Sequence, residues 1–351
     1  MSCSRRILTL SLKAYLTVIC ILFVELPWQL SCETIVPKKQ LQRLASYLIR
    51  LSDVIYFLRP FSRGASRNTA GRSSSTIRLS SDTIVDIWFW RTLFQSSDTS
   101  NISWMSLPLH IPPLLRRNKH DDKATRALRY ANQAAKASHS LHVDATPQHL
   151  GFLFASLVVF LFWGSFPLPP CLDELDFDGI DDKACINIKE FFGAVVSLAL
   201  IAPSVAGSPG KLTHIHIYTD NTSALSWMIK YRSSHPLISS LLQIFSHIQI
   251  RHHLLVTMSH IEGKKNIFAD AASREFKVPN GAALFNELCS TPQVRSLPEW
   301  TNSWLPSMTS RSTSTWHQAL GNLSALTSVP VRSSPSTSAS TPTPCDFDPR
   351  K

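Results

Sequence analysis

The chain has 351 residues, a formal net charge of +11 and 44% hydrophobic residues, enough for one or two globular domains with a real core. A basic balance of this size fits a polyanionic partner, either nucleic acid or an anionic membrane surface, and charge alone does not choose between them. The seven cysteines are scattered, with no Cys-x-x-Cys pair and no histidine at zinc-ligand spacing. The cysteine pattern argues against a disulfide framework and against cysteine catalysis, and reduced thiols in an intracellular protein are the simplest interpretation.

The N-terminal segment, residues 1–36, has the composition of a targeting signal. Its apolar run, ILTLSLKAYLTVICILFVELPWQLSC, follows Arg5 and Arg6. However, Lys13 interrupts the run early, Glu25 interrupts it late, and the region for signal cleavage is poor. We therefore expect an intracellular location, nuclear or cytoplasmic, and a signal peptide is the alternative.

Residues 37–135 are expected to form a mainly helical region. Between residues 37 and 61 apolar side chains recur at helical spacing, with basic residues on the other face. These apolar positions are Leu41, Leu44, Leu48, Leu51, Ile55 and Leu58. The stretch SRGASRNTAGRSSS, residues 62–75, is predicted to be a flexible basic loop. The next stretch, SSDTIVDIWFWRTLF, predicts a helix capped by Ser80 or Ser81.

From residue 139 the pattern changes to alternating strands and helices. The predicted strands include SLHVDAT, HIHIYTD and HLLVTMS, and the predicted helices are NIKEFFGAVVSLALIA, NTSALSWMIKYR, HPLISSLLQIFSHIQI and KKNIFADAASREF. This order predicts an α/β domain over residues 136–280, in which helices pack on a mixed sheet. Residues 281–351 are expected to be a disordered tail rich in Ser, Thr and Pro.

One apolar segment, GFLFASLVVFLFWGSFPLPP at residues 151–170, allows two interpretations. It carries no charge over twenty residues, which is long enough to span a bilayer. Its Phe and Val content, a turn at Gly164-Ser165 and the closing prolines fit two buried strands in a hairpin equally well. Its position between the first predicted strand and the first predicted helix favours the hairpin, so membrane association is not expected.

Four carboxylates fall at corresponding places in this layout. Asp144 ends the first strand, Asp220 ends the strand HIHIYTD, and Glu190 and Asp270 lie near the starts of two helices. If the two strands are adjacent, these side chains gather at one edge of the sheet, where open α/β sheets bind ligands. Clustered acids repel one another unless a cation cancels their charge. The pattern therefore predicts a site for two Mg²⁺ ions, with Mn²⁺ as a possible substitute.

The same segments resemble the ribonuclease H domain of retroelement reverse transcriptases, nearest to those of DIRS-like or Ngaro-like retrotransposons. The similar pieces are VDATPQHLGF, INIKEFFGAVVSLAL, IYTDNTSALSWM and HIEGKKNIFADAASR, within about two fifths of the chain. The resemblance implies a ribonuclease H-like fold with a five-stranded mixed sheet. It also implies that Asp144 bridges two metals, that Glu190 and Asp220 bind the second metal, and that Asp270 binds the first. The mobile histidine of the family, near the scissile phosphate, falls on His260.

Three features depart from the family pattern. The turn after Asp144 has one glycine, Gly151, where the family carries more, so strain is expected there. Gly193 replaces an alanine in the first helix, at a cost of roughly 1 kcal/mol of helix propensity. Ala272 stands where the family tends to have leucine before Ser-Arg. The departures suggest a drifting copy of the element.

The expected function is an endonuclease that cuts the RNA strand of RNA–DNA hybrids as part of a retroelement polyprotein, without a small-molecule cofactor. The alternative is a degenerate remnant that binds nucleic acid and no longer cleaves it. A membrane protein is a third, less favoured, hypothesis. A basic surface is expected to track phosphates, and a solvated basic loop is its alternative. The arginines of this surface are Arg59, Arg63, Arg67, Arg72, Arg78, Arg116 and Arg117.

Overall fold

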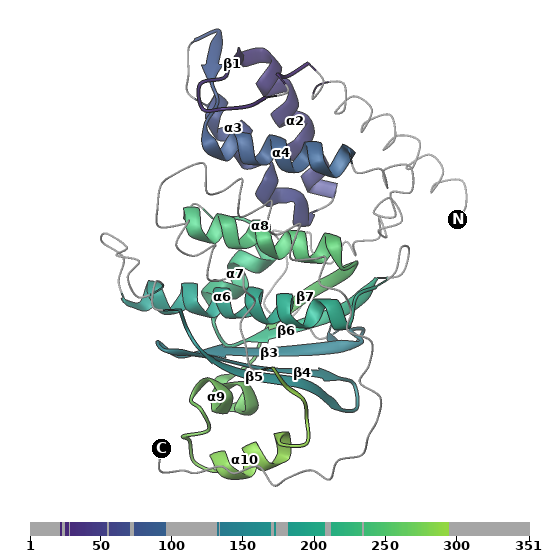
Figure 1. The fold of residues 1–351 in the computed structure, drawn as a ribbon, viewed down its shortest axis with the longest axis vertical. Helices are drawn as coiled ribbons and strands as arrows, with labels where there is room; N and C mark the ends of the chain where they lie inside the picture. Colours follow the sequence, from purple (N-terminus) through teal and green to yellow (C-terminus); the bar gives the residue numbers. More distant parts are fainter. Residues whose placement is uncertain are drawn as a thin grey trace, which may run out of the picture.

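The computed structural model describes most of residues 25–95 and 134–294, and also residues 22 and 132. Inside the two long ranges, the residues left out are 28, 55, 71–73, 170–171, 173–181, 208–211 and 234. The described residues form a helical N-terminal unit and an α/β part, which are stacked on each other in Figure 1. One hydrophobic core cluster includes side chains from both.

The helical unit contains four helical segments and a small two-stranded sheet. In chain order its elements are β1 (Ile35–Pro37), α2 (Lys38–Val54), the 3-10 helix η1 (Tyr56–Phe61), α3 (Arg63–Thr69), β2 (Thr76–Arg78) and α4 (Ser81–Gln95). The predicted apolar stripe of α2 is buried, from Leu41 through Leu51, and Leu58 of η1 is buried too. Antiparallel pairing of β1 with β2 closes the unit at one end.

The predicted flexible loop at residues 62–75 is wrong in its first half, because α3 forms there. A side chain at Gly64 would lie less than 3.0 Å from the backbone of Asp82 and Thr83. Glycine therefore lets α3 lie directly against α4, and composition alone had suggested only flexibility. The start of α4 follows the prediction, since Ser80 Oγ accepts a hydrogen bond from the Thr83 amide at 3.3 Å.

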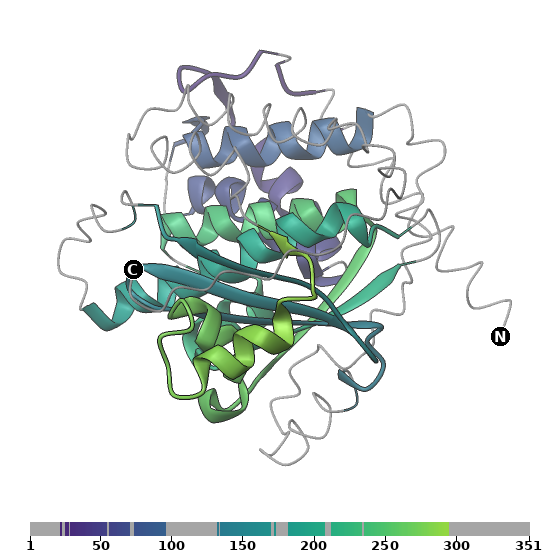
Figure 2. The ribbon, with the colours of Figure 1, turned by 60° about the horizontal axis from the view of Figure 1, so that its bottom comes forward.

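The α/β part is built on a mixed sheet of six strands, in the order β7-β6-β3-β4-β5-β8. The strands are β3 (His139–Ala145), β4 (His149–Ser156), β5 (Phe160–Pro167), β6 (Thr213–Thr219), β7 (Leu254–His260) and β8 (Gln293–Val294). The first three form an antiparallel meander, whereas β3, β6 and β7 run parallel. Figure 2 shows the strands side by side. The α/β class with a mixed sheet is confirmed, and the sheet has one strand more than the five expected.

The apolar segment 151–170 contributes to the β4–β5 hairpin, but its turn lies elsewhere than predicted. The chain reverses at residues 157–159, where the Ser156 amide donates to the Val159 carbonyl at 2.9 Å. Gly164 and Ser165 instead lie inside β5. Leu157 and Val158 are 77% and 87% exposed at the tip. The serine hydroxyl accepts amide hydrogen bonds from this tip, which makes a reversal between apolar residues possible.

Helices cover both faces of the sheet (Figure 1). One face carries α6 (Asp182–Ile201), the 3-10 helix η6 (Ala202–Ser204), α7 (Thr222–Lys230) and α8 (Pro236–Arg251). The other face carries α9 (Ile267–Ser273), which follows the 3-10 helix η7 (Gly263–Lys265), and α10 (Gly281–Leu288). Among the described helices, one apolar window, Cys185–Ser204, is long enough to cross a membrane, and most of it is buried in the core.

The prediction of a disordered tail from residue 281 is wrong for residues 281–294. Helix α10 and strand β8 lie beyond that boundary, and β8 pairs with β5. Leu288 of α10 packs with Trp163 and Phe276 in a second hydrophobic cluster. These apolar contacts hold the segment in place. The segment was wrongly assigned to the tail because the sequence around it is rich in Ser and Pro. The rest of the predicted tail, from residue 295, is outside the described residues.

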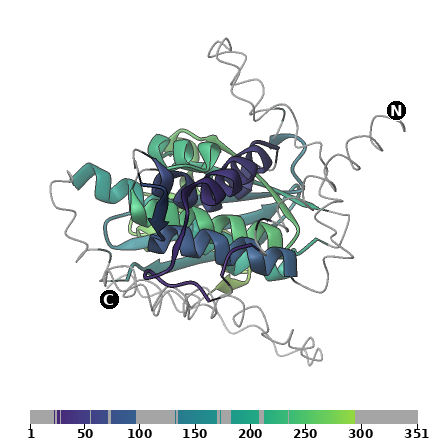
Figure 3. The same cartoon turned by 90° about the horizontal axis from the view of Figure 1, so that it is seen from above.

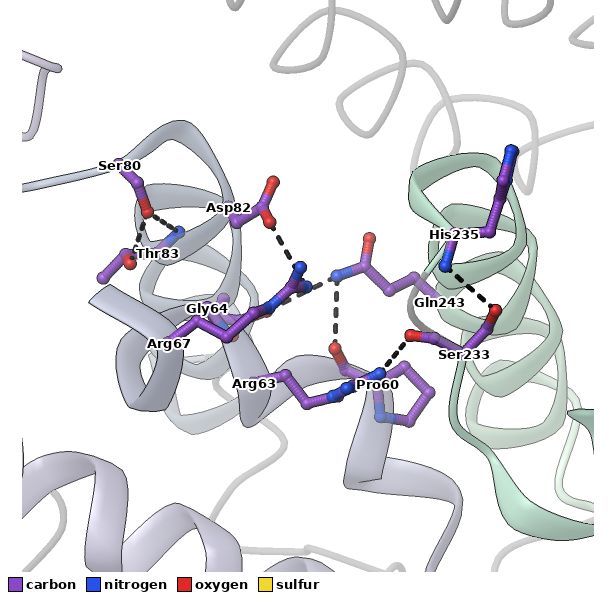
Figure 4. A network of polar contacts seen from close by, with 11 residues as sticks. Pro60, Arg63, Gly64, Arg67, Ser80, Asp82, Thr83, Ser233, His235 and Gln243 are labelled. Atoms are coloured by element: carbon purple, nitrogen blue, oxygen red, sulfur yellow. Dashed lines mark hydrogen bonds and ion pairs between the residues drawn. The ribbon is translucent and has the colours of Figure 1, made fainter. Parts of the chain in front are cut away.

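The helical unit lies over the helices of the α/β part, as Figure 3 shows from above. At the junction, Arg63 Nη1 donates to the Ser233 carbonyl, and Gln243 Nε2 of α8 donates to the Pro60 carbonyl at 3.4 Å (Figure 4). Gln243 also donates to Asp86 of α4 at 3.4 Å, and the Gly64 amide donates to Asp86 at 2.6 Å. Burial raises the pKa of Asp86 well above its ordinary value.

Asp86→Asn is expected to make the free energy of unfolding less dependent on pH. Because the folded-state pKa is raised, the folded state holds the proton after the unfolded chain has released it, and the free energy of unfolding falls as pH rises above about 3.9. Asparagine has no proton to lose, so this decline should flatten. Urea unfolding from about pH 5 to about pH 8 measures the effect, with Asp82→Asn on the same helix as the control. A decline with pH in Asp86→Asn as steep as in the native chain would contradict a protonated Asp86.

Candidate metal centre

Three carboxylates converge at one edge of the sheet, as the predicted positions of two at strand ends and one on a helix implied. Asp144 is near the end of β3, Asp220 follows β6 directly, and the register of these parallel strands pairs His142 with Tyr218. Asp144 and Asp220 each lie two positions further along, so they are neighbours. Glu190 reaches the same place from α6, and one ligand oxygen from each of the three residues lies within 4.8 Å of the others.

Glu190 is not at the start of its helix, where the sequence had placed it. Helix α6 begins at Asp182, so Glu190 lies well inside it and is 5% exposed. Its neighbour Lys189 donates to the Pro147 carbonyl at 2.6 Å, which ties α6 to the turn after β3. A helix interior fixes the direction of a side chain more firmly than a frayed first turn does.

Burial and mutual repulsion make Glu190 and Asp144 hard to ionise. Desolvation, with smaller contributions from Asp144 and Asp220, raises the pKa of Glu190 to about 9. Desolvation also raises the pKa of Asp144 to about 6, and Asp220 and Asp270 add to the increase, while a hydrogen bond from Ser273 opposes it. Without a cation, Glu190 therefore keeps its proton at neutral pH. A divalent cation would reverse this preference and ionise the group.

The donor set fits a hard divalent cation. All three residues offer carboxylate oxygens, which are the ligands that Mg²⁺ and Mn²⁺ prefer. Glu190 Oε2 is buried and has no hydrogen-bond partner among the described residues. An unsatisfied buried oxygen of this kind is costly, and metal coordination would satisfy it. The three carboxylates could thus hold a metal ion, and this donor chemistry does not distinguish between the two metals.

Asp270, the fourth expected ligand, lies beside this group and is not part of it. It occupies the first turn of α9, where Arg274 Nε donates to its Oδ1 at 2.7 Å. Asp270 is close enough to contribute to the raised pKa of Asp144. The guanidinium of Arg274 thus occupies one oxygen of the carboxylate that the sequence assigned to the first metal.

His260 is the last residue of β7, opposite Thr219 in the register, and it is exposed. The sequence had placed it on a loop before the last helix, so its backbone is more firmly held than expected. The loop that follows passes along the carboxylates, since a side chain at Gly263 would lie 3.0 Å from Asp220 Oδ2. His260 therefore lies opposite Thr219, the residue before Asp220, and it is not part of the cluster.

The sequence pattern had not identified the polar residues that hold the carboxylates in place. Ser273 Oγ donates to Asp144 Oδ2, and Asn266 Nδ2 donates to the Val143 carbonyl at 2.9 Å. One signal was present in the sequence. Ser273 comes three residues after Asp270, which places both side chains on neighbouring positions of a helix surface.

The two unusual glycines have packing roles. A side chain at Gly151 would lie less than 3.0 Å from the backbone of Ala269 and Ser273, so glycine lets α9 sit directly on β4. Gly151 lies within β4, so it is not part of the turn in which strain was expected. A side chain at Gly193 would meet the buried Leu150, so its low helix propensity is offset by the close approach of α6 to the sheet.

Models of known protein families give no match to this chain, and no curated protein matches it either. The interpretation of the site therefore depends on its geometry and on the four sequence segments described above.

The metal-free protein is expected to lose stability as pH rises from about 4.5 towards about 9, the ordinary and the folded pKa of Glu190. Between these values the folded state holds a proton that the unfolded chain has released, so the free energy of unfolding falls by at most ~1.4 kcal/mol per pH unit. Glu190→Gln should flatten this slope. Denaturation at several pH values measures it.

Mg²⁺ should raise the stability of the native chain near pH 8, and it should do so much less for Glu190→Gln. Glu287→Gln is the matched control, because it makes the same substitution at an exposed position on α10, outside the cluster of three carboxylates. An unchanged pH slope in Glu190→Gln would show that Glu190 is already ionised in the metal-free protein.

Proposed function

We propose that this chain is a ribonuclease H-type endonuclease, which hydrolyses the RNA strand of RNA–DNA hybrids with divalent metal ions. The main support is the convergence of Asp144, Glu190 and Asp220 from three separate sequence segments. Those segments resemble, in the same order, the metal-binding segments of retroelement ribonuclease H domains. In this proposal residues 136–280 are the centre of the nuclease domain, and α10 and β8 extend it.

The four carboxylates have three roles in the proposal. Asp144 would bind both metal ions, and Glu190 and Asp220 would bind the second ion. Asp270 would hold the first ion, once it is released from Arg274. When bound, such a pair of ions activates a water molecule and stabilises the leaving oxygen of a phosphodiester. His260, at the exposed rim, would transfer a proton or assist release of the cleaved phosphate.

The proposed substrate is recognised by its shape and its 2′-hydroxyl groups. Of the expected basic surface, Arg63 is held by the Ser233 carbonyl and is an unsuitable phosphate ligand. Arg67 and Arg78 each pair with an exposed acid, at 3.3 Å and 3.5 Å. Exposed pairs are worth little, so both arginines can exchange their partners for phosphate. Arg72, Arg116 and Arg117 are outside the described residues.

A degenerate remnant that binds nucleic acid without cutting it is the second candidate. The observation that favours it is the Arg274–Asp270 ion pair, which leaves the expected first-metal ligand neutralised. The two candidates differ in one measurement. A remnant would bind a labelled hybrid and leave it intact with Mg²⁺ present.

Asp144→Asn and Asp220→Asn are each expected to abolish Mg²⁺-dependent cleavage while leaving the fold intact or more stable, because each removes a repelling charge. The measurement is hydrolysis of a labelled RNA–DNA hybrid by the purified full-length chain, with and without Mg²⁺. Glu287→Gln, an exposed acid on α10, should retain the native rate. Cleavage at the native rate by either asparagine variant would exclude these residues as metal ligands.

Asp270 and His260 should behave differently in the same assay. Asp270→Ala is expected to be nearly inactive, because it removes a metal ligand and several kcal/mol of transition-state stabilisation. His260→Ala is expected to be slower by about 10²-fold and still active, since a positioned acid–base group contributes about that much. If His260→Ala kept both the native rate and the native pH profile, the histidine would be a surface residue only.

A further inference from the structure

Helix α9, which carries Asp270, is too short to be stable alone. It has seven residues, and isolated helices of that length do not persist in water. Contacts with the sheet hold it: Ser165 Oγ of β5 donates to the Ala272 carbonyl at 2.7 Å, and Thr146 Oγ1 donates to the Ser273 carbonyl at 3.3 Å. The position of α9 is thus set by the strands beneath it.

One contact of α9 differs from the others because it reaches a carboxylate of the metal centre. Ser273 is fully buried, and its hydroxyl lies within hydrogen-bond distance of both Asp144 Oδ2 and the Asp270 carbonyl. A hydroxyl has one proton, so it serves one acceptor at a time. The carboxylate is the stronger acceptor, because hydrogen bonds to charged groups are about twice as strong as neutral ones.

The backbone before Asp144 is also tied to α9. Asn266 is buried, and its side-chain amide donates to the Val143 carbonyl at 2.9 Å. Its own carbonyl accepts from the Asp270 amide at 3.0 Å, which starts the helix. Asn266 and Ser273 therefore hold the end of β3 at two points, and only the Ser273 hydroxyl reaches the carboxyl group.

We propose that Ser273 is a positioning residue of the metal centre, whose hydroxyl fixes the rotation of the Asp144 carboxyl group and couples it to the helix that carries Asp270. With Oδ2 held by Ser273, Asp144 presents its carboxylate to the metal in one orientation. The inference depends on the metal site of the proposed function. It extends that proposal by assigning a role in metal affinity to a residue that is not a ligand.

The test compares two serines that both hydrogen-bond across the α9–sheet interface. Ser273→Ala removes a hydroxyl that contacts a carboxylate, whereas Ser165→Ala removes one that contacts only the Ala272 carbonyl. Both changes are made in the full-length chain. Calorimetric titration with Mg²⁺ should show affinity about 10- to 100-fold weaker for Ser273→Ala, the range found for outer partners of metal ligands. Ser165→Ala should stay within about twofold of the native affinity, because no ligand loses a partner.

Urea denaturation separates this role from a general loss of stability. Both alanine variants should unfold cooperatively, with a larger shift of the denaturation midpoint for Ser273→Ala, and Ser273→Ala alone should lose Mg²⁺ affinity while it is still folded. Should Ser273→Ala fail to fold, Ser273→Cys keeps a small side chain with a weaker donor and should bind Mg²⁺ with intermediate affinity. Native-like Mg²⁺ affinity in the folded Ser273 variant would overturn the proposal, and so would equal losses in Ser273→Ala and Ser165→Ala.

The outcome is separable from that of the nuclease assay. A native chain that binds Mg²⁺ but leaves a labelled hybrid intact overturns the proposed nuclease, and the Ser273 comparison still decides the positioning role. A native chain that cleaves the hybrid, with a Ser273→Ala variant of unchanged Mg²⁺ affinity, overturns only the positioning role. If the native chain binds no Mg²⁺, the metal centre and the role of Ser273 are both wrong.

Discussion

The burial of three mutually repelling carboxylates, Asp144, Glu190 and Asp220, is the constraint on which the rest of the site depends. Two ionised carboxylates roughly 5 Å apart repel by about 3 kcal/mol at an effective dielectric constant of about 20, and burial adds a desolvation cost. The fold nevertheless brings them within 4.8 Å of one another, from two strand ends and a helix interior. In the metal-free protein the cost is met by protonation, as the pKa of about 9 for Glu190 indicates. A cation would remove the repulsion and release the proton together.

Helix α9 holds Asp144 in place against this repulsion. Gly151 lets the helix approach β4 until backbones touch, and Ser273 then reaches Asp144 with a hydroxyl donor. Arg274, the residue after Ser273, forms an ion pair with Asp270 and so partly neutralises the charge of this carboxylate. A single short helix thus supplies a donor, a cation and the fourth carboxylate. Its attachment to the sheet is therefore a condition for the geometry of the centre.

Much of this arrangement could be predicted from sequence because it follows from periodicity and strand order. Alternating apolar residues located β3 and β6, and the parallel layout placed Asp144 beside Asp220. Asn221 was predicted to start α7, and its side chain accepts hydrogen bonds from the Ser223 and Ala224 amides. These features are local, or they depend on the single assumption that β3 and β6 are adjacent in the sheet.

Several of the errors concern contacts between segments that are separated in sequence. Strand β8 has two residues and exists only because it pairs with β5. The Ser273–Asp144 hydrogen bond joins residues 129 positions apart, and no periodicity marks it. Helix α3 forms where Gly64 meets α4, and composition there indicates only a loop. In each case tertiary packing supplies a stabilisation that local propensity lacks.

The helical unit also supports the cluster of carboxylates, although no described residue of that unit belongs to the cluster. Gln243 of α8 donates to Pro60 and Asp86 of that unit. Two positions along α8, Phe245 packs edge-on against Phe191 of α6, with ring centroids 6.3 Å apart. Phe191 follows Glu190 directly, so the helix that presents this carboxylate is supported from behind by α8, which the helical unit covers. Removing that unit would expose a buried face of α8 and loosen the support of α6, so the smallest chain that holds Glu190 in place includes both parts.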